Sequence, residues 1–387
     1  MPIYDSLKQS LADLQSQSLF RQRRVIDSPC GPEIEIGGRR LLAFASNDYL
    51  GLAGKPALAS AAQKAARRWG AGAGASHLVS GHYAAHDALE KRLAEFVGLP
   101  AAISFSTGYM ANIAVMPALL SRNDAIFADR VNHASLVDGA LLARAELHRY
   151  PHGDLKALEG ALIASGTRRK LIVSDTVFSM DGDIAPLAGL LELAERFDAW
   201  LLLDDAHGFG VLGPQGRGAL VEAGLQSERI IYMGTLGKAA GVAGAFVAGS
   251  QELIDWLVNT ARAYIFTTAA PPMLAETLLA AVDLIENADA QRAHLQKLIA
   301  TFRKGMQGTR WTLPDSHTPI QPVIVGDNAE TLALARALDD AGFWVPAIRP
   351  PTVPAGSARL RVSLTAAHTL KQVQALTATL QTLSAAA

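Results

Sequence analysis

The sequence has only one cysteine, Cys30, among 387 residues. A single cysteine excludes an internal disulfide and a zinc site built from cysteines. No hydrophobic run approaches the roughly 20 residues of a membrane-spanning helix. Basic residues do not cluster heavily and the formal net charge is −1, which argues against nucleic acid as the main partner. Half of the residues are hydrophobic and 18% are charged, a composition typical of a compact globular chain.

The N-terminal segment also lacks the features of a secretory signal. Asp5 and Asp13 interrupt it where a signal peptide needs a continuous apolar stretch. Its hydrophobic residues instead recur at helical spacing, at Ile3, Leu7, Leu11 and Leu14. We expect an amphipathic helix that packs as an arm on the body of the protein or on a second subunit, and we expect a cytoplasmic protein.

Strand-like and helical patterns alternate through the middle of the chain. Six hydrophobic runs are expected to be strands, at Ala101–Phe105, Ala125–Ala128, Leu171–Val173, Trp200–Leu203, Ile230–Met233 and Gly244–Ala248. This alternation predicts an α/β fold with a mainly parallel sheet that helices cover on both faces.

Three domains are expected from these patterns. Residues 1–45 form an N-terminal helix and hairpin arm, residues 46–285 form the large domain, and residues 286–387 form a smaller α+β domain. A strand is expected over Phe343–Ile348 in the last of these.

Two of the predicted strands are followed by an unusual combination of polar residues. Trp200–Leu203 leads into Asp204 and His207, and Ile230–Met233 leads into Lys238. Open α/β sheets built from buried parallel strands bind ligands at the carboxyl ends of those strands. A lysine, a carboxylate and an imidazole delivered there suit pyridoxal phosphate, because a lysine binds the aldehyde of this cofactor and an acid pairs with its ring nitrogen.

Asp205 directly follows Asp204 and is expected to have a different role. Neighbouring side chains of an extended chain point to opposite sides. We therefore expect Asp205 to point away from the ligand and to be structural.

A glycine pattern in the same region resembles a dinucleotide-binding loop. Gly208, Gly210 and Gly213 match G-x-G-x-x-G and follow a predicted strand. That motif also needs a helix that begins within it. Pro214 and the glycines after it oppose an α-helix, so we do not expect a nicotinamide or flavin site here.

A different turn is a candidate phosphate site. Gly108 and Tyr109 follow the predicted strand Ala101–Phe105 and open a helical pattern. Backbone N–H groups at a helix N-terminus bind phosphate well. Such turns are common in α/β proteins, so the prediction depends on the whole set of residues.

Beyond these sites, seven segments carry a resemblance to a known family. They are SNDYLGL (46–52), GASHLVSGH (74–82), FSTGYMAN (105–112), ADRVNHASLVDG (128–139), DTVFSMDGDIAPL (175–187), DDAHGFGVLGPQGRG (204–218) and IRPPTVPAGSARLRVSLTAAHT (348–369). Together they resemble the α-oxoamine synthases, which are pyridoxal-phosphate enzymes of fold type I. The resemblance covers nearly the whole chain in unbroken order.

The resemblance implies a fold, a reaction and partners. The expected fold is a large domain with a mostly parallel seven-stranded sheet and a smaller α+β C-terminal domain, in a homodimer with active sites at the subunit interface. The family joins an amino acid to an acyl thioester with loss of carbon dioxide. The C-terminal segment favours L-alanine and a pimeloyl thioester, carried on coenzyme A or on an acyl carrier protein, as substrates.

Other functions stay open. A glycine acyltransferase making 2-amino-3-oxobutanoate, or a relative that uses longer acyl chains, would share the same chemistry. A non-catalytic binding or regulatory protein on this fold would be a different class, but a binding protein has no need of the retained reactive residues.

The resemblance also implies roles for the residues at the strand ends. Lys238 holds the cofactor covalently and acts as nucleophile and base. Asp204 bonds the protonated ring nitrogen, and His207 bonds the phenolic oxygen. His133 stacks on the ring and assists at the thioester carbonyl.

Further residues are implied to contact the cofactor. Gly108 and Tyr109 form the phosphate cup, and Thr235 adds a hydroxyl to the same phosphate. Ser179 contacts the cofactor from a loop after a strand. Thr268 reaches the phosphate in the neighbouring subunit.

The substrate side is implied at five positions. Arg349 holds the carboxylate of the amino acid, for which the fork of a guanidinium is well suited. Thr352 and Arg21 contact the acyl substrate, although Arg21 and its neighbouring arginines fit a solvated basic patch equally well. Asn47 and Ser76 shape the acyl side or the partner-subunit side of the pocket.

Overall fold

The computed structural model describes residues 3–385, and these divide into two compact units. The first, here called the sheet unit, consists of residues 50–179 and 184–292. The second, the terminal unit, combines the chain up to Tyr49, Met180–Asp183 and the chain from Ala293 onwards. Within residues 3–385, no helix is both long enough and apolar enough to cross a membrane.

The sheet unit is built on seven strands. Their order is β3 (Ala101–Phe105), β9 (Ala245–Gly249), β8 (Ile230–Thr235), β7 (Ala199–Asp204), β6 (Lys170–Asp175), β4 (Ala125–Asp129) and β5 (Glu146–Tyr150). Only β9 runs antiparallel to its neighbours, β3 and β8. The prediction of a mostly parallel seven-stranded sheet is confirmed.

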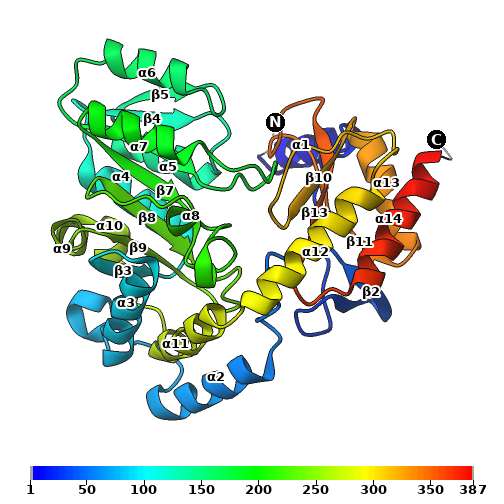
Figure 1. Ribbon diagram of the computed structural model, residues 1–387, viewed down its shortest axis with the longest axis horizontal. Helices are drawn as coiled ribbons and strands as arrows, with labels where there is room; N and C mark the ends of the chain where they lie inside the picture. Colours follow the sequence, from blue (N-terminus) through cyan, green and yellow to red (C-terminus); the bar gives the residue numbers. More distant parts are fainter. Residues whose placement is uncertain (1–2, 386–387) are drawn as a thin grey trace. The chain divides into compact units, whose positions relative to one another are not determined.

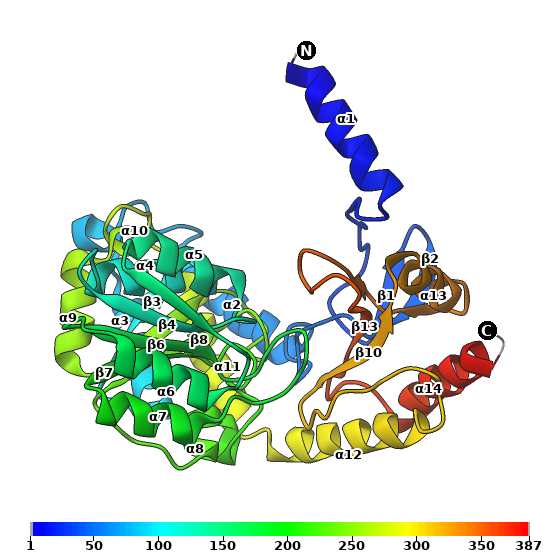
Figure 2. The ribbon, with the colours of Figure 1, turned by 90° about the horizontal axis from the view of Figure 1, so that it is seen from above.

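The central strands form because they are apolar along their whole length. Nearly every residue of β4, β6, β7 and β8 is buried, as expected for a parallel sheet that helices cover on both faces. Figure 2 shows α4 (Gly108–Leu119) and α5 (Ala134–Ala143) on one side of the sheet, and α6 (Leu155–Ala164) and α7 (Leu187–Arg196) on the other.

Further helices complete this unit (Figure 1). They are α2 (Pro56–Trp69), α3 (Ala84–Val97), α8 (Ala219–Glu222), α9 (Gln251–Thr260), α10 (Arg262–Ile265) and α11 (Pro272–Glu286), with a short π-helix at His77–Gly81.

The edge strand β5 was not among the six strands expected from hydrophobic runs. Its sequence, ELHRY, contains three charged or imidazole side chains and is only partly buried. It pairs with β4 alone, in parallel. An edge strand needs no continuous apolar run, and charged side chains on it discourage pairing with other chains.

The terminal unit contains two small sheets. The first has the order β1 (Glu33–Ile36), β2 (Arg39–Ala43) and β11 (Phe343–Trp344), and the second has the order β10 (Ile320–Gly326), β13 (Ala358–Ser363) and β12 (Ala347–Ile348). Gly37 and Gly38 join β1 to β2 with φ of 55° and 75°, a conformation suited to a two-residue hairpin turn. The helices are α12 (Asp289–Gly305), which begins in the sheet unit, α13 (Asn328–Asp340) and α14 (Leu370–Ala385).

The prediction of a single strand over Phe343–Ile348 is wrong. The structure divides it into β11 and β12, which belong to different sheets. Pro346 lies between them, and its missing N–H donor interrupts strand pairing at that point.

The N-terminal helix α1 (Ile3–Ser16) has the expected extent but buries none of its residues. Ile3, Leu7 and Leu11 are 74%, 54% and 49% exposed. Within the terminal unit, α1 therefore does not show the first of the two expected arrangements, packing on the body of the protein.

Helix α3 protects the outer edge of the sheet at β3. Ser104 of β3 donates to Glu90 Oε1 of α3 from its backbone N–H at 2.8 Å and from its hydroxyl at 2.7 Å. Burial raises the pKa of Glu90 to about 7, although the two bonds from Ser104 act to lower it. The protonated acid is thus favoured in the folded state.

This shift predicts a pH-dependent stability. The ordinary pKa of the carboxyl is 4.5, so the folded state binds the proton more tightly. The contribution of Glu90 to the stability of the folded state is fully present below pH 4.5 and is lost as the pH rises through 7. The free energy of unfolding of Glu90→Gln, relative to that of wild type, should rise as the pH increases from 4.5 to 7.5. We expect this rise to be at most about 3 kcal/mol. Urea unfolding across this pH range measures the difference.

The exposed Glu95 on the same helix supplies the control, Glu95→Gln, which makes the same chemical change at an unburied position. An offset of Glu90→Gln from wild type that does not change with pH would contradict the role assigned to burial.

Candidate active site

A cavity lies at the carboxyl ends of the central strands. It is lined by Gly108, Tyr109, Asn112, His133, Ser135, Asp175, Asp204, Ala206, His207, Met233, Thr235 and Lys238. All predicted cofactor residues except Ser179 and Thr268 are in this set. Parallel pairing aligns the strand ends, because Asp204 lies opposite Asp175 on β6 and opposite Met233 on β8.

Lys238 lies in the loop that follows β8. Its Nζ donates a hydrogen bond of 3.3 Å to Thr235 Oγ1, and Thr235 Oγ1 donates one of 3.2 Å to the carbonyl of Ala206. Ala239 and Ala240, which follow the lysine, are buried against the unit. The amine is therefore held at the cavity while the chain behind it is fixed by packing.

Asp204 ends β7 and is 3% exposed. Its Oδ1 accepts from the backbone N–H of Ala206 at 3.0 Å, and its Oδ2 accepts from Asn112 Nδ2 at 2.8 Å. A carboxylate held by such donors is oriented for a charge-assisted hydrogen bond with a cationic ring nitrogen.

Asp205 points away from this cavity, as predicted. It is fully buried and accepts hydrogen bonds from Thr176 Oγ1, the backbone N–H of Ala219 and the hydroxyl of Tyr232. Burial raises the pKa of Asp205 to about 6 despite these donors. Asp205 thus ties three segments of the sheet unit together.

His133 caps the N-terminus of α5. Its backbone N–H donates to Asp175 Oδ2 at 2.7 Å. Burial lowers the pKa of its imidazole, and the charge of Lys238 lowers it further, while Asp204 and Asp138 act in the opposite direction. The neutral ring is therefore favoured.

Asp175 is a member of the cavity that was not predicted. It ends β6 and is 3% exposed. Burial, and then the charge of Asp204, raise the pKa of Asp175 well above its ordinary value. The signal was present, since Asp175 ends a hydrophobic run just as Asp204 does.

Asn112 and Ser135 were also missed. Asn112 lies four residues after Gly108 on α4, and so on the same face of the helix. Ser135 lies two residues after His133. Helical spacing from a predicted site residue would have identified Asn112.

Gly108 and Tyr109, the predicted phosphate cup, lie at the N-terminus of α4. Thr107 caps the helix by accepting from the backbone N–H of Met110 at 3.1 Å, and the N–H groups of Gly108 and Tyr109 belong to the first turn, which lacks intrahelical acceptors. A Cβ at position 108 would lie 2.7 Å from Thr235 Cγ2, so only glycine allows this approach.

These residues fit pyridoxal phosphate. The cavity combines a primary amine, a buried carboxylate, two imidazoles and a helix N-terminus suited to a dianion. Asn112 Oδ1 also lies buried without a hydrogen-bond partner among residues 3–385. Lys238 would bind the aldehyde, Asp204 the ring nitrogen, and Gly108, Tyr109 and Thr235 the phosphate.

The predicted substrate residues divide between the units. Ser76 belongs to the sheet unit and precedes the π-helix, whereas Arg21, Asn47, Arg349 and Thr352 belong to the terminal unit. Arg21 Nη2 donates to Thr352 Oγ1 at 3.3 Å. The predicted acyl-substrate residues Arg21 and Thr352 thus come together although 331 positions separate them.

Arg349 lies in the same part of the terminal unit. It donates from Nη1 to the carbonyl of Ser18, and its buried Nε has no partner among the described residues. Burial, and then the charge of Arg21, lower the pKa of Arg349. Asn47 accepts from Arg361 Nη1 at 3.0 Å.

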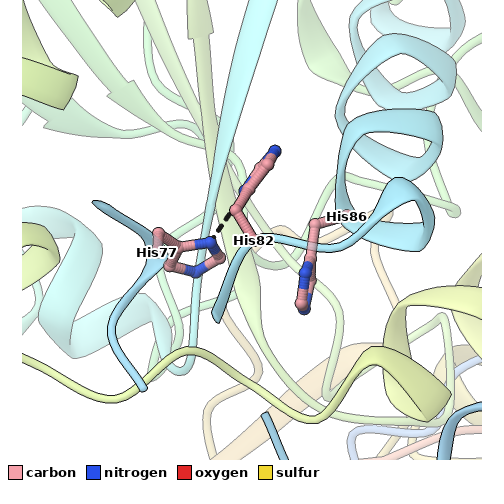
Figure 3. Close-up of side chains that lie close together, drawn as sticks. All are labelled: His77, His82 and His86. Carbon is pink, nitrogen blue, oxygen red and sulfur yellow. Dashed lines mark hydrogen bonds between the residues drawn. The ribbon is translucent and has the colours of Figure 1, made fainter. Parts of the chain in front are cut away.

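A cluster of three histidines lies outside the cavity (Figure 3). His77 Nδ1 and His82 Nδ1 are 2.9 Å apart, and His86 lies beside them. His86 accepts from the backbone N–H of Tyr83 at Nδ1 and faces the carbonyl of Ala270 at Nε2. Both ring nitrogens of His86 therefore take part in hydrogen bonds, and no lone pair is left for a metal ion. The side chain instead positions the two segments that it joins.

The glycine pattern at residues 208–213 does not begin an α-helix. The chain turns there and continues into a short 3-10 turn at Pro214–Gly216. The expectation that this segment is not a dinucleotide loop agrees with this geometry.

Comparisons with known proteins agree with this site. The model of the aminotransferase class I and II family matches residues 39–380. An 8-amino-7-oxononanoate synthase from Aromatoleum aromaticum is 66% identical over 383 residues, which cover 99% of both chains. One from an Azoarcus species is 65% identical over 385 residues, covering 100% of this chain and 99% of the relative.

A solved structure shows the same fold. Serine palmitoyltransferase from S. paucimobilis with a bound PLP–myriocin aldimine is 30% identical, with a TM-score of 0.93, and the match covers 99% of this chain and 98% of that one. The match extends through both units, and that relative carries the cofactor that the cavity fits. The chain therefore belongs to the aminotransferase class I and II family and, within it, to the 8-amino-7-oxononanoate synthases.

Proposed function

We propose that this chain condenses L-alanine with a pimeloyl thioester, releasing carbon dioxide and a thiol and giving 8-amino-7-oxononanoate for biotin synthesis. The observation that carries the proposal is the cavity that combines Lys238, Asp204 and His133. It occurs in a chain that is 66% identical to an 8-amino-7-oxononanoate synthase. The cofactor is pyridoxal phosphate, which supplies an electron sink for the carbanion that forms at the α-carbon of the amino acid.

Lys238 moves the protons in this proposal. Its amine takes the proton from the α-carbon of alanine and returns a proton to the same carbon after carbon dioxide has left. Asp204 keeps a proton on the ring nitrogen, which strengthens the electron sink. Both side chains line the cavity, as these roles require.

The other residues bind and orient. His133 stacks against the ring and donates a hydrogen bond to the thioester carbonyl, while His207 bonds the phenolic oxygen and Ser179 makes a further contact. Arg349 binds the carboxylate of alanine through its guanidinium fork. Arg21 and Thr352 bind the acyl chain, a role that their mutual hydrogen bond supports.

We also propose that the protein is a homodimer in which Thr268 reaches the cofactor phosphate of the partner, and Asn47 and Ser76 shape the shared pocket. Hydrophobic side chains exposed on α1 and on the sheet unit support an interface between copies. Leu78, Val79 and Phe266 are 52%, 79% and 70% exposed. Burying apolar surface stabilises an assembly by roughly 25 cal/mol per Å².

The substrate assay tests the proposal directly. Purified protein is incubated with L-alanine or glycine and with pimeloyl-CoA, pimeloyl carrier protein or acetyl-CoA, and thiol release is followed. We expect release with alanine and a pimeloyl donor. Turnover restricted to glycine and acetyl-CoA would replace the proposal with a glycine acyltransferase, and a colourless protein inactive with every pair would indicate a binding protein.

The role of Lys238 predicts a single labelled lysine. Borohydride should fix the cofactor to Lys238, because reduction makes the link to the amine permanent, and peptide mass spectrometry locates it. Lys238→Ala should abolish turnover, whereas Lys91→Ala, a change in an exposed lysine, should leave it unchanged. Cofactor found on any other lysine would refute the assignment.

The role of Arg349 predicts a selective loss of amino-acid binding. Arg349→Ala should raise the KM for alanine about 10–100-fold, since a charge-assisted hydrogen bond is lost, and should change the KM for the thioester much less. Initial-rate kinetics separate the two constants. Arg24→Ala, which breaks an ion pair with Asp339 elsewhere in the terminal unit, is the control. Equal increases in both KM values would remove the carboxylate role.

The apolar face of α1 predicts a contribution to the dimer. The double change Leu7→Asp and Leu11→Asp should weaken the dimer at least tenfold, because two exposed leucines would be replaced by charges in the interface. Light scattering across a dilution series measures this. Gln9→Asp with Ala12→Asp adds the same charge on the opposite face of the helix and should leave the dimer intact. Unchanged dissociation in both variants would exclude α1 from the interface.

A further inference from the structure

A buried chain of hydrogen bonds connects Asp204 to His133. Asn112 Nδ2 lies 2.8 Å from Asp204 Oδ2 and 2.9 Å from Ser135 Oγ. Ser135 Oγ lies 2.7 Å from His133 Nδ1. Asn112 and Ser135 are 0% and 1% exposed, so water does not compete for these bonds.

The donors in this chain can be assigned in order. A carboxylate only accepts hydrogen bonds, so the amide nitrogen of Asn112, not its oxygen, faces Asp204. The second N–H of the same amide is directed at Ser135 Oγ. With that oxygen accepting from Asn112, the hydroxyl proton of Ser135 is available for His133 Nδ1.

A second donor reaches the same ring nitrogen. The backbone N–H of Ser135, which can only donate, lies 3.3 Å from His133 Nδ1. His133 Nδ1 therefore carries a lone pair, and the ring proton of the neutral imidazole is on Nε2.

We infer that Asn112 and Ser135 are positioning residues that hold His133 as the Nε2–H tautomer and couple its orientation to that of Asp204. The inference rests on the proposed function, in which His133 acts at the thioester carbonyl. His133 then serves as a neutral N–H donor at Nε2, and the same amide that orients Asp204 determines where the imidazole proton resides.

The charges around His133 act together with this chain. Lys238 opposes a positive imidazole, Asp204 and Asp138 favour one, and Asp175 accepts from the backbone N–H of His133. Burial lowers the pKa of His133 more than any of these charges changes it. A hydroxyl that donates to Nδ1 also opposes protonation there, so its removal should raise the pKa of His133.

Two variants of the holoenzyme test the inference. Ser135→Ala removes the hydroxyl but leaves the backbone N–H, and Asn112→Asp removes the amide donor at nearly constant volume. Nitrogen-15 NMR of histidine-labelled protein reports the tautomer, with the His133 signals assigned by their loss in His133→Gln. Thr277→Val, which removes a buried hydroxyl bonded to a helix carbonyl, is the control.

We expect wild type and Thr277→Val to show the Nε2–H tautomer of His133. Ser135→Ala should show a mixture of tautomers, because only the longer bond of 3.3 Å from the backbone N–H of residue 135 then holds His133 Nδ1 as an acceptor. The protonation midpoint of His133 should move to higher pH, and kcat should fall about tenfold with the KM for alanine changed less than about threefold. Asn112→Asp should shift the absorption of the bound cofactor as well, because it places a second carboxyl group beside Asp204.

An Nδ1–H tautomer in wild type, or an unchanged tautomer and protonation midpoint in Ser135→Ala, would overturn the inference. These NMR readouts need no turnover. An inactive wild type with every amino acid and thioester would contradict the proposed function instead, so the two failures are distinguishable.

Discussion

The register of β7 between β6 and β8 is the constraint on which the site depends. It places Asp204 opposite Asp175 and Met233 at the carboxyl edge of the sheet. Adjacent residues of a strand face opposite ways, so a slip of one residue would replace Asp204 with Asp205 at the cavity. Asp205 opposes such a slip, because its bonds to Thr176, Ala219 and Tyr232 hold it on the other side.

The cavity brings several ionisable groups together in a buried place, and the surroundings of each carboxyl group differ. Asp204 has donors from Ala206 and Asn112, whereas Asp175 is buried beside Asp204 and its pKa is raised well above the ordinary value. Burial beside a second carboxyl group thereby favours the protonated form of Asp175. Lys238 adds the positive charge that a cavity for an anionic cofactor requires.

The sequence predicted those parts of the fold and site that have a local pattern. Hydrophobic runs located six strands, and the polar residues at the ends of two strands located the cavity with Asp204 and Lys238. Strand β5 was missed because an edge strand can be polar. The bonds of Asn112 to Ser135 and Asp204 could not be predicted, because they join residues 23 and 92 positions apart and exist only in the folded chain.

We propose above all that Asp204 keeps the ring nitrogen of the bound cofactor protonated. Nitrogen-15 NMR of pyridoxal phosphate labelled at that nitrogen tests it most directly, with wild type compared with Asp204→Asn at the same pH. We expect the chemical shift of a protonated ring nitrogen in wild type and of an unprotonated ring nitrogen in the variant. An unprotonated nitrogen in wild type, or the same shift in both proteins, would contradict it.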